Sequence, residues 1–159
     1  MNIPFLDLSQ QYHCIKDEIN KTIEKVLENS SFIKGEEVEK FERDFASIHN
    51  VKNCVGVANG TDALIIALKV LNIGQGDEVI VPANSFIATS EAVSAVGAKV
   101  VFVDNDPSSY CMDINKIKEK ITPETKAVIP VHLYGQAADM DPLMELAKTN
   151  GIRIIEDSA

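Results

Sequence analysis

Residues 76–103 have the sequence GDEVIVPANSFIATSEAVSAVGAKVVFV. The apolar run Glu78–Val81 predicts a short strand, because β-branched residues dominate it. The segment Phe86–Val96 carries apolar residues at helical spacing and is followed by Gly97, a residue typical of helix ends. Lys99–Val103 is again apolar and β-branched. A strand, a helix and a second strand in this order form the unit from which parallel sheets are built.

The same alternation continues on both sides of this stretch. We expect further strands at Cys54–Ala58, Lys126–Val131 and Ile152–Glu156, and further helices at Asp62–Leu71, Asp113–Ile121 (with Asp113 as the N-cap) and Met140–Asn150. Apolar strands between amphipathic helices indicate a sheet that is buried on both faces. The sequence therefore predicts an α/β fold with a mostly parallel sheet sandwiched by helices.

The opening third of the chain is helical and lies outside this alternation. Apolar residues recur at helical spacing over Gln11–Asn29, and a second helix is expected over Glu36–Ile48. Gly35 stands between the two, which suits a bend in the chain. We therefore expect an N-terminal helical segment (residues 1–50) followed by an α/β domain (residues 51–159).

Composition and charge argue against several classes of protein, namely nucleic-acid-binding, metal-binding and membrane-spanning proteins. The chain has 159 residues, 45% of them hydrophobic and 25% charged, as in an ordinary globular domain. Its formal net charge is −9 and its basic residues do not cluster, so we expect no nucleic-acid partner. Three scattered cysteines and three histidines without metal-ligand spacing predict reduced thiols and no metal site. No apolar run reaches the ~18 residues of a membrane span, and we expect a soluble protein of the cytoplasm.

The turn between Cys54–Ala58 and Asp62–Leu71 is a candidate phosphate site. Unpaired N–H groups at a helix start and the positive end of its dipole attract phosphate. Gly60 lets the backbone approach an anion closely, the Thr61 hydroxyl can donate a further hydrogen bond, and Asp62 can offer its own N–H. The alternative is an ordinary helix cap whose residues serve only the geometry of the turn. No Gly-x-Gly-x-x-Gly or P-loop motif points to a dinucleotide or a nucleoside triphosphate.

Phe86 follows the carboxyl end of the expected strand Glu78–Val81, in what we expect to be the first turn of a helix. An aromatic ring there can lie flat on a planar ligand. The alternative is a core phenylalanine that packs beneath the helix, which the general burial preference of phenylalanine favours.

Asp157 directly follows the last expected strand. In open α/β sheets ligands lie beyond the carboxyl ends of the strands. The carboxylate there can act as a general base, as a ligand for a ribose or a metal, or as the partner of a protonated ring nitrogen; the alternative is a surface residue that ends a strand. His132 faces the same edge, where a hydrogen-bonded structural histidine is favoured over a base. A phosphate site, an aromatic ring and a carboxylate on one edge would suit pyridoxal phosphate.

The chain resembles the N-terminal part of the DegT/DnrJ sugar aminotransferases, which are pyridoxal-phosphate enzymes of fold type I. The resemblance extends from residue 3 to the last residue. Its motifs are Ile3–Leu8 (IPFLDL), Gly35–Glu42 (GEEVEKFE), Val55–Leu64 (VGVANGTDAL), Gly76–Ala83 (GDEVIVPA), Ile121–Pro123 with Thr125–Ala127, His132–Gln136 (HLYGQ) and Ile155–Asp157. Departures are mild: Ser85 and Ser158 stand where Thr, and Ala or Cys, are common.

The resemblance implies a cofactor and a set of contacts for it. Pyridoxal 5'-phosphate would be held at its phosphate by Gly60 and Thr61, stacked by Phe86 and paired at its ring nitrogen with Asp157. Family members aminate a nucleotide-linked ketosugar, usually with glutamate as the amino donor, and their sites are generally built at dimer interfaces, so we expect a homodimer.

The resemblance also places part of the chemistry elsewhere. The Schiff-base lysine, the sugar-binding loops and the C-terminal domain follow the segment that matches Asp157, so we expect this chain to be part of a longer enzyme and to be inactive alone. Lys99 and Lys126 are expected to belong to the scaffold. Two alternatives stay open: a pyridoxamine-dependent sugar dehydratase of the same family, and a non-catalytic binding or interaction module.

Overall fold

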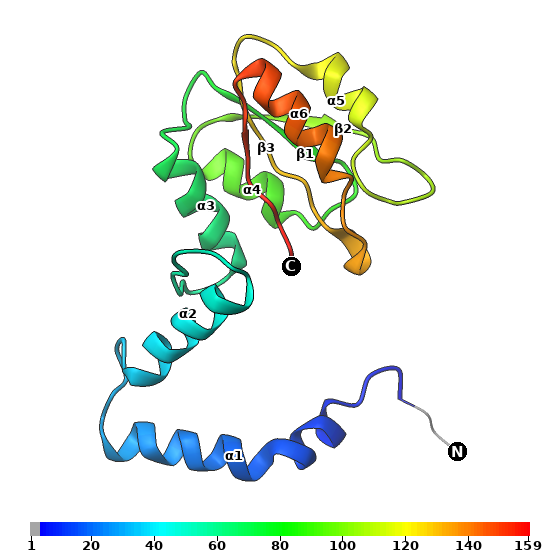
Figure 1. Ribbon diagram of the computed structural model, residues 1–159. Helices are drawn as coiled ribbons and strands as arrows, with labels where there is room; N and C mark the ends of the chain where they lie inside the picture. Colours follow the sequence, from blue (N-terminus) through cyan, green and yellow to red (C-terminus); the bar gives the residue numbers. More distant parts are fainter. Residues whose placement is uncertain (1–3) are drawn as a thin grey trace. The chain divides into compact units, whose positions relative to one another are not determined.

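The computed structural model describes residues 4–159, which form two compact units, one that ends at Gly56 and one over Val57–Ala159. The first unit contains two helices, α1 (Leu8–Glu28) and α2 (Glu36–Ile48) (Figure 1). Helix α2 has the predicted bounds, whereas α1 begins three residues before the expected Gln11. The cause is Asp7, whose carboxylate accepts a hydrogen bond from the N–H of Gln10 at 3.1 Å and so caps the helix start.

Gly35 makes the bend between the two helices possible. It is the N-cap of α2, and a Cβ atom built on it would lie only 2.9 Å from the carbonyl oxygen of Ser31. No side chain fits at that distance, so the close approach of the two backbone segments requires glycine.

The second unit alternates helices and strands. In chain order it contains α3 (Gly60–Val70), β1 (Glu78–Pro82), α4 (Ala88–Ala95), β2 (Lys99–Val103), α5 (Ile114–Lys120), β3 (Thr125–Val128), the short 3-10 helix η1 (Leu133–Gly135), α6 (Met140–Asn150) and β4 (Arg153–Ile154). The strands form one parallel sheet in the order β2-β1-β3-β4. This confirms the predicted α/β fold.

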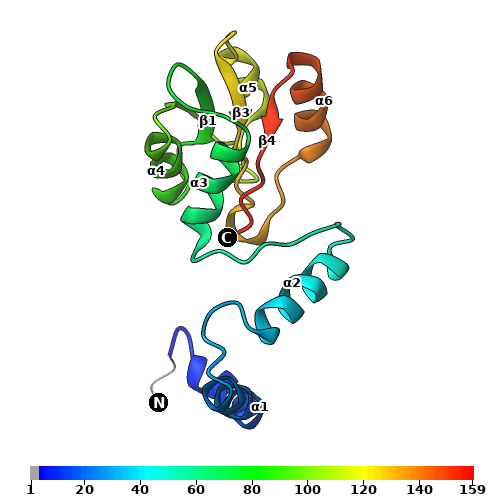
Figure 2. The ribbon, with the colours of Figure 1, turned by 90° about the vertical axis from the view of Figure 1, so that its left-hand side faces the viewer.

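Helices cover both faces of the sheet, with α3 and α4 on one face and α5 and α6 on the other (Figure 2). The central strand β1 shows how the sequence produces this: Val79 and Val81 pack in the core under α3 and α4, whereas Ile80 between them packs in the core under α5 and α6. All three side chains are fully buried, as expected of a parallel strand with alternating side-chain directions.

The predicted strand Cys54–Ala58 is wrong. The segment enters no sheet among residues 4–159, so the sheet has four strands where five were expected. A strand needs a neighbour for its backbone groups, and the N–H of Gly56 instead donates to the carboxylate of Glu42 at 2.7 Å. Its two valines remain exposed, with Val55 72% accessible.

Other predicted boundaries also differ: α3 begins at Gly60 and not at Asp62, and β3 covers Thr125–Val128 and not Lys126–Val131. Helix α4 begins at Ala88, so Phe86 lies in the turn before the helix and not in its first turn. The last strand, expected over Ile152–Glu156, is limited to Arg153–Ile154, and a single bridge between Val131 and Asp157 continues the pairing with the chain after β3. Among the helices of residues 4–159, none has the length and apolar character that crossing a bilayer would require.

Candidate cofactor site

The carboxyl edge of the sheet holds all four predicted cofactor contacts. Helix α3 runs antiparallel to the strands, so its first residues, Gly60 and Thr61, lie at the edge where β1, β3 and β4 end. In Figure 2 the start of α3 and the end of the chain after β4 lie at this same end of the sheet. The turn that carries Phe86 follows the carboxyl end of β1, so it lies at the same edge of the sheet.

The start of α3 is capped by Asn59. Its side-chain oxygen accepts a hydrogen bond from the N–H of Asp62 at 2.8 Å, and its amide group donates to the Asp62 carboxylate at 3.1 Å. The expectation that the N–H of Asp62 could serve a ligand is therefore wrong. No atom of residues 4–159 accepts a hydrogen bond from the N–H groups of Gly60 and Thr61. Two unpaired donors therefore lie at the positive end of the helix dipole.

Open space surrounds Gly60. A Cβ atom built on this glycine would meet no atom within 4 Å, apart from its chain neighbours and its own helix. No other described residue fills the space on the Cβ side of Gly60. Two free N–H donors, open space and the positive end of a helix dipole favour the binding of a phosphate group.

Phe86 is exposed, with 78% of its surface accessible. The alternative interpretation as a core phenylalanine is therefore wrong. Its position is fixed by the backbone, because its carbonyl oxygen accepts a hydrogen bond from the N–H of Thr89 at 3.2 Å at the start of α4. An aromatic ring presented to solvent at this edge has a free face for a planar ligand.

Asp157 is held by its backbone and by its side chain. Its N–H donates to the carbonyl of Pro130 at 2.9 Å, and its carbonyl accepts from the N–H of His132 at 3.0 Å. One carboxylate oxygen, Oδ2, accepts from the hydroxyl of Thr89 at 3.3 Å, and the other, Oδ1, accepts from the N–H of Ala159 at 3.2 Å. Each oxygen has two lone pairs, so each can still accept one hydrogen bond from a ligand.

Thr89 is the residue that the sequence analysis missed. It is almost completely buried, on the first turn of α4, and it lies 68 residues from its partner in the chain. A threonine near a helix start carries no sequence signal for such a contact. A hydrogen-bonded path therefore joins Phe86 to Asp157 through Thr89, whereas no hydrogen bond among the described residues joins Gly60 or Thr61 to either of them.

His132 is a hydrogen-bonded structural residue, as favoured from the sequence. Its Nδ1 accepts from the N–H of Ala138 at 3.2 Å, so the proton resides on Nε2, which lies 3.1 Å from a carboxylate oxygen of Glu156. Both ring nitrogens are thus occupied, and the pair fixes the segment after β3 against the segment after β4.

The two strand lysines lie at the opposite, amino edge of the sheet. Lys99 begins β2 and donates to the carboxylate of Glu78 at 2.6 Å, and Lys126 donates to the carbonyl of Pro123 at 3.0 Å. Glu78 is buried and also accepts from the hydroxyl of Thr122 at 2.7 Å. The Lys99 ammonium, followed by the Thr122 hydroxyl, holds the pKa of Glu78 below its ordinary value. These contacts place both lysines in the scaffold, as predicted.

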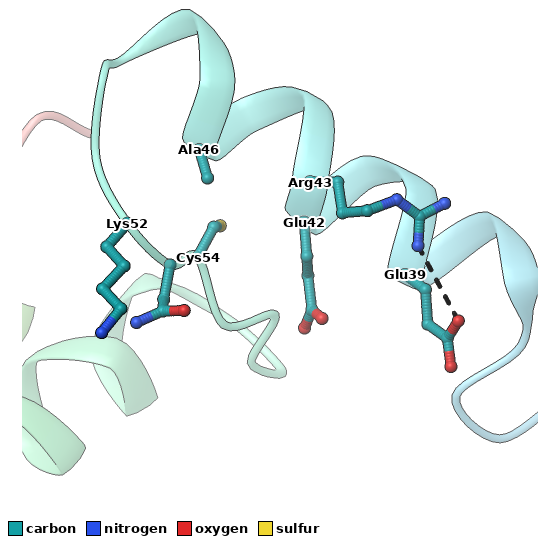
Figure 3. Close-up of a pocket in the computed structure, with 7 residues that line it drawn as sticks. Glu39, Glu42, Arg43, Ala46, Lys52 and Cys54 are labelled. Carbon is teal, nitrogen blue, oxygen red and sulfur yellow. Dashed lines mark ion pairs between the residues drawn. The ribbon is translucent and has the colours of Figure 1, made fainter.

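The first unit contains a separate hollow of about 280 Å³ (Figure 3). Its walls come from α2 and the segment after it: Glu39, Glu42, Arg43, Ala46, Lys52, Asn53 and Cys54. A guanidinium nitrogen of Arg43 lies 3.9 Å from a carboxylate oxygen of Glu39, and the two form an ion pair. The carboxylate of Glu42 accepts a hydrogen bond from the N–H of Gly56. None of the predicted cofactor contacts lines this hollow. Within residues 4–159 no cluster of three or more His, Cys, Asp or Glu side chains could hold a metal.

The donors at the carboxyl edge fit a pyridoxal cofactor, and solved structures of similar proteins define the class. DesV from S. venezuelae superimposes with a TM-score of 0.96 at 45% sequence identity, over 99% of this chain and 42% of that protein. NtdA from Bacillus subtilis, solved with bound cofactor PMP, gives 0.94 at 38% identity, over 98% of this chain and 36% of that protein. The fold is that of the pyridoxal-phosphate-dependent aminotransferases of fold type I.

The family follows from the sequence match. Residues 13–159 match the DegT/DnrJ/EryC1/StrS aminotransferase family, to which the chain belongs. One relative, the UDP-N-acetyl-3-dehydro-alpha-D-glucosamine 3-aminotransferase of Acidithiobacillus ferrooxidans, is 52% identical over 99% of this chain and 42% of its own length. The chain thus spans about two fifths of the length of the curated relatives it matches.

Proposed function

We propose that the whole protein to which this chain belongs transfers an amino group from glutamate to the keto group of a nucleotide-linked sugar, with pyridoxal 5'-phosphate as cofactor. The observation that carries the proposal is the fixed carboxylate of Asp157 at the carboxyl edge of the sheet, with a free acceptor site on each oxygen. A carboxylate in this position suits a protonated ring nitrogen, because a charge-assisted hydrogen bond contributes about 1.5–3 kcal/mol.

Each of the other predicted residues has a role in this proposal. The N–H groups of Gly60 and Thr61 bind the cofactor phosphate at the positive end of α3. The ring of Phe86 lies on one face of the cofactor, and Asp157 keeps the ring nitrogen protonated. When bound, the cofactor supplies the electron sink that amino-group transfer requires.

The substrate class rests on the relatives. The Acidithiobacillus enzyme is named for a UDP-linked 3-dehydro sugar that is aminated at C3, so the proposed acceptor is a ketosugar joined to a nucleotide. The donor glutamate and a homodimeric assembly belong to the same proposal and follow from the family resemblance.

The first test is to determine the codons that follow Ala159 in the gene and to express the whole reading frame. The purified protein is incubated with pyridoxal phosphate and glutamate, and 2-oxoglutarate is measured. A UDP-linked 3-ketosugar is then added, and its amino product is detected by mass. We expect both products, and we expect Asp157→Asn to lower turnover by about 10- to 150-fold, the equivalent of one charge-assisted hydrogen bond.

Other outcomes would replace the proposal. Loss of water from the sugar without amination would assign a dehydratase. Cofactor binding without conversion of either substrate would assign a binding module. Amination with a different amino donor would contradict only the choice of glutamate as donor and would leave the rest of the proposal standing.

A further inference from the structure

Hydroxyl groups on helix α4 make two different kinds of contact. Ser90 donates to the carbonyl of Ile87 at 2.9 Å, and Ser94 donates to the carbonyl of Ser90 at 3.1 Å. Both bonds stay within the local chain, which is the usual behaviour of serine and threonine in helices. Thr89 instead donates its single hydroxyl proton to Asp157, on a different element of the fold.

The contact between Thr89 and Asp157 is partly buried, and its donor side is almost completely buried. Thr89 is 2% exposed, so water does not compete for its hydroxyl group. A buried hydroxyl without a partner is costly, and the carboxylate of Asp157 satisfies it. In the part of the chain that the structure describes, Thr89 is the one side chain that donates to this carboxylate.

The hydroxyl group restricts the orientation of the carboxylate. The backbone of Asp157 is already fixed by its bonds to Pro130 and His132, which leaves the side-chain torsions free. A donor on Oδ2 from Thr89 and a donor on Oδ1 from Ala159 together define the carboxylate plane. The direction of the remaining lone pairs is thereby set before any ligand binds.

Thr89 also belongs to the turn that carries Phe86. Its N–H donates to the carbonyl of Phe86 at 3.2 Å. The backbone of Thr89 therefore fixes the segment that carries the Phe86 ring, and the side chain of Thr89 fixes the carboxylate of Asp157. The contact proposed for the face of the cofactor ring and the contact proposed for its nitrogen are coupled through the first turn of α4.

We propose that Thr89 is a positioning residue that aims the carboxylate of Asp157 at the ring nitrogen of the pyridoxal cofactor, an inference that rests on the proposed function. Its hydroxyl group does not touch the cofactor and acts through Asp157. Removal of the hydroxyl lets the carboxylate rotate and weakens its bond to the ring nitrogen, whereas a serine at this position preserves the bond.

The test uses the whole protein, four single variants and the double variant Thr89→Val with Asp157→Asn. Thr89→Val removes the hydroxyl while keeping the shape, Thr89→Ser keeps the hydroxyl, and Asp157→Asn removes the charge. Ser94→Ala, on the same helix, is the matched control because its hydroxyl bonds only within α4. The dissociation constant for pyridoxal phosphate is measured by absorbance titration, the absorption band of the bound cofactor is followed against pH, and thermal unfolding is recorded without cofactor.

We expect Thr89→Val to raise the dissociation constant by about 3- to 10-fold, the worth of one hydrogen bond, and to shift the pH midpoint of the absorption band. Thr89→Ser and Ser94→Ala should stay within about twofold of the parent. In the Asp157→Asn background, Thr89→Val should have no further effect, because Thr89 acts through the carboxylate. If the valine variant does not fold, Thr89→Ala replaces it.

Two results separate the inference from the proposed function. If Asp157→Asn alters affinity and spectrum but Thr89→Val does not, Thr89 is not a positioning residue and the proposed function stands. If Asp157→Asn itself changes neither property, the proposed contact with the ring nitrogen fails, and the inference fails with it. Equal effects of Thr89→Val with and without Asp157→Asn would also overturn the inference.

Discussion

Gly60 can be tested separately for binding and for stability, because a side chain at this position would enter open space. We expect Gly60→Ala to leave the free energy of unfolding unchanged or to raise it by at most about 1 kcal/mol, since alanine is the better helix former. The added methyl group would crowd an anion on the N–H groups of α3. Affinity for pyridoxal phosphate should therefore fall by at least about 10-fold.

The measurement combines urea unfolding of the cofactor-free protein with absorbance titration of the cofactor. Val70→Ala is the control: Val70 ends the same helix, is exposed, and lies at the opposite end from Gly60. A Gly60→Ala protein that binds the cofactor like the parent would contradict a phosphate site at this helix start.

Phe86, like Gly60, can be tested separately for its effects on stability and on cofactor binding. Because 78% of its surface is accessible, Phe86→Ala should change the free energy of unfolding by less than about 0.5 kcal/mol. Loss of ring stacking, at about 0.5–1.5 kcal/mol, should weaken cofactor binding about 2- to 13-fold. Phe86→Tyr should bind like the parent and Phe86→Leu like the alanine variant; a leucine variant with full affinity would show that the ring is not used.

The sequence could suggest single residues at this edge, but not their connections. Gly60 begins a helix, Phe86 lies in the turn before one and Asp157 follows the last strand, where α/β proteins bind ligands. Residue chemistry suggested their roles beside open alternatives, and the resemblance to the family favoured these roles. Thr89 could not be found in this way. Its partner is 68 residues away, and only the folded sheet brings the two together.

Glu78 ties the amino ends of β1 and β2 together and gives this part of the sheet a pH dependence. Its contacts with Lys99 and Thr122 hold its pKa below the ordinary value, so the folded state binds a proton less readily than the unfolded state. The resulting stabilisation is complete above the usual glutamate pKa of about 4.3 and is lost as the pH falls through the lower folded value. Acid should therefore remove it.

Urea unfolding of the parent and of Glu78→Gln between neutral pH and about pH 3 measures this effect. At neutral pH we expect the variant to be less stable by about 1–3 kcal/mol, because a buried charged acceptor is lost. The difference should shrink as the pH falls below the usual glutamate pKa. A difference that stays constant over the whole range would exclude the ionised carboxylate as the source of the stabilisation.

Helices were predicted more accurately than strands, for a physical reason. The bounds of α2 and α6 match the prediction because their ends depend on local residues, such as Gly151, which closes α6 in a left-handed conformation with φ of 68°. A strand depends on a neighbour that is distant in the sequence. The run Cys54–Ala58 has suitable residues but no partner strand among residues 4–159, and this dependence is invisible in a local pattern.

The largest departure from an ordinary domain concerns the burial of the first unit. Among its described residues, Ala46 is the one hydrophobic side chain that is buried. Apolar side chains recur at helical spacing along α1, and apart from the half-buried Ile19 this series is exposed: Leu8, Tyr12, Ile15, Ile23 and Leu27. On α2 the exposed set is Val38, Phe41, Phe45 and Ile48. Exposed apolar surface on this scale is typical of a surface that associates with another molecule.

We therefore expect the 159-residue chain to self-associate in solution, which sedimentation velocity over a range of concentrations would measure. Replacing Ile15 and Ile23 with glutamine keeps the helix propensity of α1 while removing apolar surface, so association should shift to higher concentration. Lys21→Gln, which changes an exposed polar position of the same helix, is the control and should behave like the parent. A chain that sediments as a monomer at every concentration would contradict the prediction, because its apolar side chains would then remain exposed to water without causing association.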